Sequence, residues 1–241
     1  MRTDAGTASE RQRQAFLENV RRALGQTRSN GSAAAAGTGE RTNARPVQPE
    51  NNRERAAQAK SQDNALEVFC RRAREAGMTV VRCGSPAALG EEVRGLLRRL
   101  GATAVLLEDD PLLRELGVAE AARGAGAQTT SGGGAAAALA ADVGISAAAA
   151  GLVETGSVVL TTGAGRSRLG SVAPPVHLTI LPAARLCRDW SELWARVAGG
   201  PGVELPALVT LVTGPSKTAD IEMTTVIGAH GPLAEYVFVV G

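Results

Sequence analysis

Residues 208 to 222 read Leu-Val-Thr-Leu-Val-Thr-Gly-Pro-Ser-Lys-Thr-Ala-Asp-Ile-Glu and join an apolar strand to a polar turn. In an open α/β sheet, ligands bind at the carboxyl ends of the strands, so this turn lies where a binding site is expected. Gly214 permits the turn, Ser216 or Thr218 can cap a following helix, and Lys217 adds a cation beside exposed amides. The stretch predicts a strand, a turn and a helix that could bind a small anion.

The same residues also suit an ordinary strand-to-helix connection, in which Ser216, Thr218 or Asp220 serves only as the N-cap. The turn is not a P-loop, because the stretch from Gly214 to Lys217 lacks the Gly-Lys-Ser/Thr order of that motif. Nucleotide hydrolysis therefore gets little support, while the anion site and the plain connection both stay open.

The composition predicts an α/β domain with a tail. The chain has 241 residues, of which 44% are hydrophobic and only 2% aromatic, so its core must consist of Ala, Val, Leu and Ile. The first 60 residues carry 11 Lys and Arg against 6 Asp and Glu, but their charges are dispersed and lack interleaved aromatics. Nucleic-acid binding is therefore not expected.

The cysteines and the N-terminus predict a cytoplasmic protein. Cys70, Cys83 and Cys187 are far apart and form no Cys-x-x-Cys pair, which favours a reducing compartment and disfavours a zinc or iron-sulfur site within this chain. The first ten residues are polar, and no run of about 18 apolar residues occurs, so neither a signal peptide nor a membrane span is expected.

Three regions are expected along the chain. Residues 1–25 contain an amphipathic helix, with an apolar stripe that includes Phe16 and Val20. Residues 26–52 are rich in small and polar residues and read as a flexible linker. Residues 53–241 form the α/β domain.

Helices and strands alternate in the first part of this domain, which implies a parallel sheet covered by helices on both faces. The expected elements are a helix at 53–76, a strand at 78–83, a helix at 86–100, a strand at 104–107 and a short helix at 111–116.

Residues 124–150 are rich in Ala and Gly, and the spacing of Gly132 to Gly134 fits no dinucleotide-binding motif, so they are interpreted as a compositional insertion. Four later segments are short, apolar and β-branched, as strands covered on both faces should be. They are residues 158–162, 177–181, 208–213 and 236–240.

A second group of candidate residues surrounds the segment 158–162. Glu154, Thr155 and Gly156 precede it, and a glycine-containing loop with Arg166 and Arg168 follows it. A carboxylate at the start of an apolar strand is costly to bury unless it is paired or functional, so Glu154 is a candidate nucleophile, base or arginine partner. Guanidinium groups suit carboxylate and phosphate ligands, although a solvated turn would have the same composition.

The chain has two histidines, His177 and His230. His230 lies in Gly-Ala-His-Gly-Pro, at an expected helix exit, where it can act as an acid or base or simply complement the helix dipole. His177 starts a strand and is expected to be structural. Two isolated histidines without matching acidic spacing make a weak case for metal, so no metal site is predicted.

Four ordered segments resemble the motif series of the LUD domain family, in its lactate utilization protein C group. They are Glu154-Thr-Gly-Ser-Val-Val-Leu160, Pro174-Pro-Val-His-Leu178, Gly214-Pro-Ser-Lys-Thr-Ala-Asp-Ile-Glu222 and Gly228-Ala-His-Gly-Pro232. Residues 141–146 also resemble the family's segment before the Glu-Thr-Gly motif. The strong likeness covers residues 139–241, and Arg21 to Gly25 is similar to the family's opening.

The resemblance implies a three-layer α/β/α fold with a mostly parallel sheet, of the NagB/RpiA/CoA-transferase-like kind. It also implies participation in the oxidation of L-lactate to pyruvate beside partner subunits that carry iron-sulfur clusters, with this chain as the cluster-free subunit. Two positions depart from the family pattern: Lys217 replaces the usual arginine and Ser157 the usual threonine. The lysine weakens a bidentate carboxylate contact into a point-charge contact.

Lactate oxidation needs an anchor for the carboxylate, a base for the hydroxyl proton and an electron acceptor. Arg166, Arg168 or Lys217 could supply the anchor, and His230 or Glu154 the base. The remaining candidate residues are Thr155, Gly156, Gly214, Ser216 and Thr218 around the substrate, with His177, Asp220 and Glu222 supporting them. No electron acceptor is evident, so a bound cofactor stays unknown.

Two other interpretations stay open. In one, the chain is a non-catalytic assembly or regulatory subunit of the same complex, and the motifs shape an interface. In the other, Glu154 forms an acyl intermediate, as in CoA-transferase-like enzymes.

Overall fold

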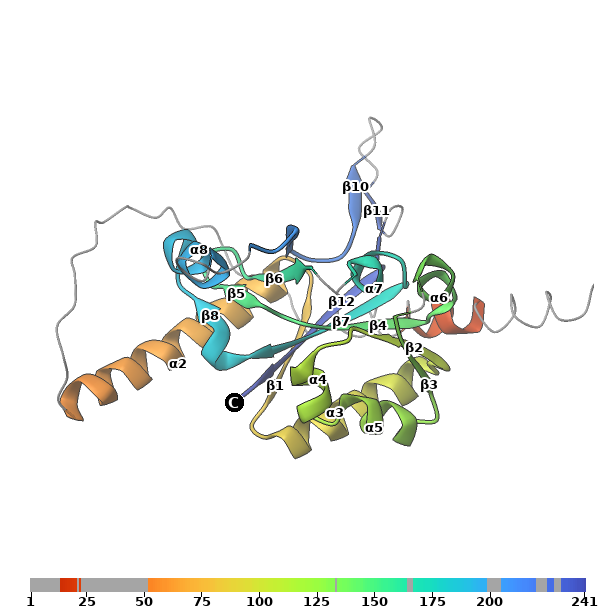
Figure 1. The fold of residues 1–241 in the computed structure, drawn as a ribbon, viewed down its shortest axis with the longest axis horizontal. Coiled ribbons are helices and arrows are strands. Elements are labelled where there is room, and N and C mark those ends of the chain that lie inside the picture. Colours follow the sequence, from red (N-terminus) through yellow and green to blue (C-terminus); the bar gives the residue numbers. More distant parts are fainter. Residues whose placement is uncertain are drawn as a thin grey trace, which may run out of the picture.

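The computed structural model describes residues 14–20, 22, 52–132, 134–163, 167–198, 205–219, 225–227 and 231–241. A six-stranded sheet in the order β1-β12-β7-β4-β2-β3 forms the centre, and all neighbouring strands in it are parallel (Figure 1). Its strands are β1 (Thr79–Cys83), β2 (Ala104–Leu107), β3 (Gln128–Ser131), β4 (Val143–Ala147), β7 (Val176–Pro182) and β12 (Ala234–Val240).

Helices cover one face of this sheet, and helices with a second sheet cover the other. The first face packs against α3 (Pro86–Leu100), α4 (Pro111–Glu115) and α5 (Val118–Gly124) in the largest apolar core. The opposite face packs against α2 (Asn52–Glu75), α6 (Gly134–Ala140) and α7 (Leu169–Val172). The predicted three-layer α/β/α class with a mostly parallel sheet is thereby confirmed.

Local signals set the bounds of the first helices. Ser85 caps α3, because its side chain accepts a hydrogen bond from Ala88 N at 3.1 Å, and Pro86 occupies the first turn. Gly101 ends the helix in the left-handed conformation, with φ of 65°. These bounds coincide with the predicted helix at 86–100.

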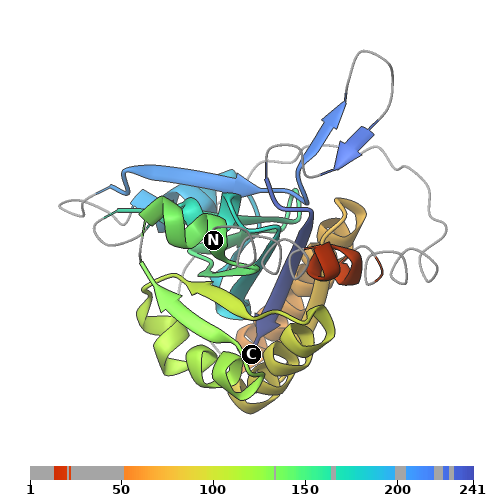
Figure 2. The ribbon, with the colours of Figure 1, turned by 90° about the vertical axis from the view of Figure 1, so that its right-hand side faces the viewer.

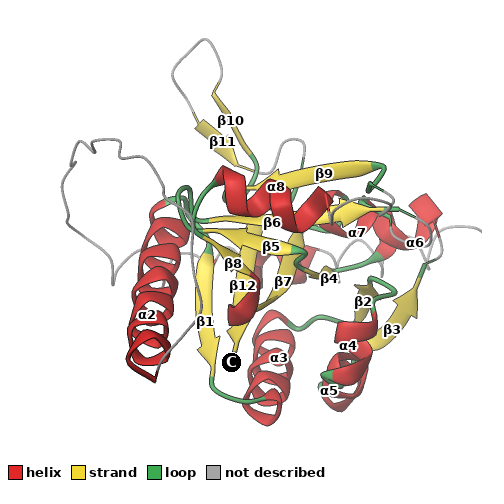
Figure 3. Cartoon of the chain, turned by 60° about the vertical axis from the view of Figure 1, so that its left-hand side comes forward, coloured by secondary structure: helices red, strands yellow, loops and turns green. Residues whose placement is uncertain are grey.

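A second sheet, in the order β8-β5-β6-β9, corrects the prediction that residues 158–162 and 208–213 form doubly covered parallel strands. Its strands are β5 (Ala150–Leu152), β6 (Ser157–Thr162), β8 (Leu186–Cys187) and β9 (Leu208–Val212). β6 pairs antiparallel with both β5 and β9. A turn of only four residues joins β5 to β6, and such a short connection permits antiparallel pairing alone. Figure 3 shows α8 (Trp190–Ala198) lying against this sheet.

The interpretation of residues 124–150 as an insertion is wrong. These residues contain β3, α6, β4 and the first residue of β5, and β4 is a fully buried strand near the middle of the main sheet. Small side chains are required here, because an added Cβ on Gly144 would lie 1.8 Å from the carbonyl oxygen of Gly170 in α7. The glycine lets α7 pack directly on the backbone of β4.

Among the described residues after Gly214, a β-hairpin stands where the sequence predicts a helix. It consists of β10 (Lys217–Ala219) and β11 (Thr225–Ile227), and it projects from the body of the protein (Figure 2). Pairing with β11 and the β-branched residues of both strands favour this hairpin.

Near the N-terminus, residues 14–20 and 22 are helical, and Phe16 and Val20 are buried in the core around α3. Asn19 Nδ2 donates to the carbonyl oxygen of Leu100 at 3.3 Å. Of the predicted linker, only Asn52 lies within the described residues, so the division of the chain at residues 25 and 52 stays a prediction. Within the described part of the chain, each helix is too short or too polar to span a membrane.

Candidate functional site

Two of the predicted motifs meet at the last turn of α2. Gly156 has φ of 69°, and a Cβ added to it would lie 2.4 Å from Ala73 N. Gly214 has φ of 100°, and its added Cβ would lie 2.3 Å from Ala76 O. Both turns therefore need glycine in order to approach the helix backbone, a packing requirement that the sequence alone did not indicate.

Hydroxyl groups link the same two turns. Thr155 Oγ1 and Ser157 Oγ lie 2.6 Å apart, and Ser157 Oγ lies 2.7 Å from Thr213 Oγ1, so each pair shares a hydrogen bond. Ser157 is buried, and its hydroxyl bridges the start of β6 to the end of β9.

Two cations at this turn bind backbone carbonyl groups. Arg72 Nη1 donates to Glu154 O at 2.6 Å and to Val153 O at 3.2 Å, while Lys217 Nζ donates to Ala76 O at 3.2 Å. Ala76 directly follows α2, where the helix dipole presents its negative end. Lys217 thus complements a helix C-terminus, whereas the sequence predicted that it would lie beside exposed amides.

Glu154 lies in the tight turn between β5 and β6, where its side chain is exposed. An exposed carboxylate needs no buried partner, so burial does not mark Glu154 as functional, contrary to the expectation from the sequence. Ser216 does not cap a helix either, because it directly precedes strand β10, and its N–H donates to Pro232 O at 3.0 Å.

Other candidate residues lie elsewhere or outside the described residues. Arg168 is exposed and directly precedes α7, and its carbonyl oxygen accepts from Ser171 N at 3.0 Å. For Thr218 the structure describes only the backbone in β10. The candidates outside the described residues are Arg166, Asp220, Glu222 and His230.

A small pocket lies at the carboxyl ends of β2 and β3, the edge where ligands of α/β sheets bind. Its volume is about 50 Å³. Glu108 fixes one wall, because its carboxylate accepts from Ala147 N at 3.0 Å and so joins the ends of β2 and β4. The described lining residues are Leu106, Leu107, Glu108, Asp109, Gly132, Gly134, Ser167, Leu169 and Gly170. Arg168 is the cation next to this lining in sequence.

The main sheet also carries a buried polar group, of which the sequence indicated only His177. His177 Nδ1 lies 2.8 Å from Glu235 Oε2, and His177 Nε2 lies 3.2 Å from Ser146 Oγ. The three side chains come from β7, β12 and β4 and are all buried. Glu235 could have been found, because a lone carboxylate in the apolar run Ala-Glu-Tyr-Val-Phe-Val-Val needs a buried partner.

This Ser146-His177-Glu235 group can hold a proton in two arrangements. An ionised Glu235 accepts from Nδ1–H while Ser146 donates to Nε2, or a protonated Glu235 donates to Nδ1 while Nε2–H donates to Ser146. Burial raises the pKa of Glu235, and the adjacent His177 opposes this shift. With His177 fully buried, the group's evident role is to join the three central strands.

Thr179 lies on the same face, opposite Ser146 in the strand register. Its hydroxyl is buried without a hydrogen-bond partner among the described residues. Because an unsatisfied buried hydroxyl is costly, Thr179→Val is expected to raise the free energy of unfolding by about 1 kcal/mol. Urea unfolding measures this change, with the exposed Thr130→Val as the matched control. A lower stability of Thr179→Val would show that the hydroxyl has a partner.

Comparisons with known proteins agree with this architecture. The family model described as the LUD domain matches residues 66–240. The crystal structure of a DUF162 family protein from Deinococcus radiodurans superimposes with a TM-score of 0.52 over 75% of this chain and 98% of that one. Its sequence identity is 19%, so this likeness concerns the fold alone.

Curated relatives give the closer sequence likeness. Lactate utilization protein C of an Exiguobacterium species is 31% identical over 193 residues, which are 74% of this chain and 79% of that protein. Protein YkgG of Escherichia coli, whose function is uncharacterized, is 30% identical over 72% of this chain and 78% of its own length. Lactate utilization protein C of Halalkalibacterium halodurans is 38% identical, but the match spans only 41% of that protein.

The fold and its covered parallel sheet define a three-layer α/β/α protein. The match over residues 66–240 and the curated relatives identify it further: the chain belongs to the LUD domain family, in its lactate utilization protein C group.

Proposed function

We propose that this chain takes part in lactate utilization, as the cluster-free subunit of a complex that oxidises L-lactate to pyruvate. The observation that carries the proposal is the match to a lactate utilization protein C over 79% of that relative's length. The proposed location is the cytoplasm, and the proposed partners are subunits with iron-sulfur clusters.

The positions of the cysteines support a division of labour between subunits. The chain has three cysteines, and an iron-sulfur cluster is usually held by about four thiolates. Cys70, Cys83 and Cys187 are buried in three different apolar cores. Burial raises the pKa of Cys83 to about 11, with Glu92 adding to the shift, so its thiol stays protonated. Cluster ligands would accordingly come from partner subunits.

The arginine loop before α7 is the proposed anchor for the substrate carboxylate. Arg168 is exposed beside the pocket at the ends of β2 and β3, whereas Arg72 and Lys217 hydrogen-bond to carbonyl groups around α2. A guanidinium can bind the carboxylate of a 2-hydroxy acid in a bidentate manner. Arg166 belongs to the same loop in sequence, and Glu154 or His230 remains the proposed base for the hydroxyl proton.

A specific observation favours a second candidate, a non-catalytic assembly or regulatory subunit of the same complex. Gly156, Gly214 and Lys217 all contact the C-terminal end of α2, so these three motif residues shape a junction within the fold. In this alternative the projecting hairpin β10–β11, which follows that junction, belongs to the assembly surface.

Deletion of the gene for this chain from its host is expected to abolish growth on L-lactate as sole carbon source, and the wild-type gene is expected to restore it.

Arg168→Ala should lower lactate oxidation by the reconstituted complex about 100-fold, because it misplaces the substrate. The matched control is Arg123→Ala, which removes an exposed arginine of α5 and is expected to leave the rate unchanged.

The readout is lactate-dependent reduction of an artificial electron acceptor, with and without the partner subunits. Unimpaired growth of the deletion strain on lactate would contradict the proposed function. Full activity of Arg168→Ala, together with loss of subunit co-purification in Lys217→Ala, would favour the assembly alternative.

A further inference from the structure

Strand β9 forms an unprotected apolar edge. It is the last strand of the sheet β8-β5-β6-β9, so its outer side has no neighbouring strand among the described residues. Its sequence, Leu-Val-Thr-Leu-Val, contains no charge and no proline. Every other residue of an edge strand directs its N–H and C=O groups outward, and such an edge readily pairs with another chain.

The other edge strands of the six-stranded and four-stranded sheets are protected. β1 carries the charged Arg82, and β3 consists of Gln, Thr, Thr and Ser. β8 is only two residues long and lies between Arg185 and Arg188 in sequence. Charges, prolines, polar residues and short length are the usual devices against pairing, and β9 has neither charge nor proline, with Thr210 as its only polar residue.

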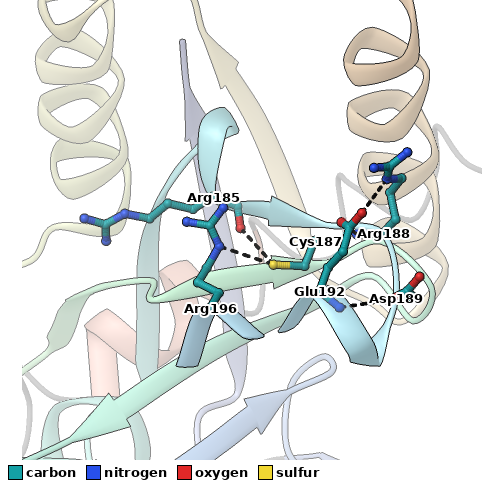
Figure 4. A network of polar contacts seen from close by, with 6 residues as sticks. All are labelled: Arg185, Cys187, Arg188, Asp189, Glu192 and Arg196. Atoms are coloured by element: carbon teal, nitrogen blue, oxygen red, sulfur yellow. Dashed lines mark hydrogen bonds and ion pairs between the residues drawn. The ribbon is translucent and has the colours of Figure 1, made fainter. Parts of the chain in front are cut away.

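Helix α8 adds an aromatic surface to the same edge. Leu193 and Val197 point into the core shared with Val209 and Leu211 of β9. Arg196 Nε lies 3.4 Å from Cys187 Sγ, and Arg196 Nη2 donates to Ala184 O at 3.2 Å, so this flank of α8 faces β8 (Figure 4).

The two tryptophans of the chain lie on the opposite flank of α8. Trp190 and Trp194 are 39% and 49% exposed, and their rings stack with centroids 6.5 Å apart. On a helical wheel, the inward pair Leu193 and Val197 separates them from Arg196, which places the tryptophans toward the β9 side of the sheet. Exposed tryptophans in a chain with 2% aromatic residues indicate an interface, where this residue type is enriched.

We propose that β9 pairs antiparallel with β9 of a second copy of this chain, about a two-fold axis through Thr210. In this register Leu208 faces Val212 of the second copy, Val209 faces Leu211, and Thr210 faces its own counterpart. Each cross-strand pair joins two apolar residues or two threonines, so the strand is complementary to itself. The two four-stranded sheets become one continuous sheet.

The tryptophans complete this interface. Val209 and Leu211 point toward α8 in each copy, so the two α8 helices lie on the same face of the joined sheet. Trp190 and Trp194 of each copy then flank the new strand pair. The second copy is the occupant because β9 is complementary to itself in this register, and its edge carries no charge to complement a charged partner.

A disulfide tests the register directly. Residues opposite each other in antiparallel strands have Cα atoms about 4.5 or 5.5 Å apart, within the range that a disulfide bridges. Thr210→Cys is expected to form a covalent dimer on mild oxidation, since the native cysteines are buried and unavailable. Glu120→Cys, which places a thiol at an exposed site of α5, is the control and should stay monomeric on a denaturing gel.

Sedimentation of the wild-type protein is expected to give twice the chain mass of 24.6 kDa. Thr210→Lys places like charges on the axis, and Trp190→Ala/Trp194→Ala removes the aromatic contacts, so each should shift the mass to the monomer. Gln128→Lys adds the same charge to the exposed strand β3 and should leave the dimer intact. Circular dichroism checks that all variants fold.

Tryptophan fluorescence gives an independent readout, because both tryptophans lie at the proposed interface. The wild-type emission maximum should move to shorter wavelength as protein concentration rises through the dimerisation range. Three results would overturn the proposal: a wild-type monomer at 100 µM or above, a dimer that Thr210→Lys leaves intact, or equal cross-linking of Thr210→Cys and Glu120→Cys.

Discussion

Gly144→Ala is expected to lower the free energy of unfolding by at least about 3 kcal/mol, the upper part of the range for inserting atoms into a packed core. The added Cβ would lie 1.8 Å from Gly170 O and 2.8 Å from Gly170 C. Because both are backbone atoms, no side-chain rotation can relieve the overlap, and α7 must move away from β4. In a chain of this size the melting temperature should fall by roughly 6–12 °C.

Chemical denaturation followed by circular dichroism measures the loss. Gly163→Ala is the matched control, because a Cβ at Gly163 meets nothing within 4 Å. Equal midpoints for the two variants would show that α7 does not pack on β4. Since Leu169 and Gly170 of α7 line the pocket at the ends of β2 and β3, Gly144→Ala should also impair substrate binding there if the proposed function holds.

The sequence predicted the elements whose limits depend on neighbouring residues. The helix at 86–100 agrees with α3 because Ser85, Pro86 and Gly101 act within one turn of its ends. The strand at 104–107 agrees with β2 for a similar reason, since flanking residues interrupt its apolar run. The three-layer class followed from the alternation of such elements.

The errors concern partners that lie far away in the sequence. Apolar strands look alike whether another sheet, a helix or solvent covers them, so the membership of β6 and β9 in a second sheet could not be recognised. β10 became a hairpin strand through its pairing with β11. β4 was not recognised within the Ala-rich residues 124–150, because their small side chains do not resemble an apolar strand. They are small because other elements pack closely on them, most closely at Gly144.

The candidate site shows the same limit. The sequence pointed to the two motif turns as a ligand site, and the structure shows that Gly156 and Gly214 are required there for the contact with α2. The chemistry of these turns differs from the prediction of an anion site, because they meet the C-terminal end of α2. The negative end of this helix dipole attracts Lys217 and would repel an anion. Only the three-dimensional structure reveals which end of which helix a turn meets.

The second large effect is expected from the buried pair His177 and Glu235. Glu235→Ala leaves His177 Nδ1 without its partner in the sheet, and breaking a buried pair on one side typically costs about 3–5 kcal/mol. His177→Ala should cost a similar amount, and the double variant less than the sum of the two. Urea unfolding of the three variants measures the coupling, and additive losses would show that the two side chains act independently.

The pH dependence distinguishes the ionisation of Glu235 from simple packing. Burial raises the pKa of Glu235 in the folded protein, so the folded state keeps a proton that the unfolded chain has already released. The resulting stability is fully present below the ordinary pKa of a glutamate, about 4.3, and is lost as pH rises through the raised pKa.

Glu235→Gln keeps the shape of the side chain and cannot titrate. The stability of the wild type relative to Glu235→Gln should therefore fall as pH rises above that value, by at most about 1.4 kcal/mol per pH unit for one proton. A difference that stays constant from pH 4 to pH 9 would mean that the pair contributes only through its fixed hydrogen bond.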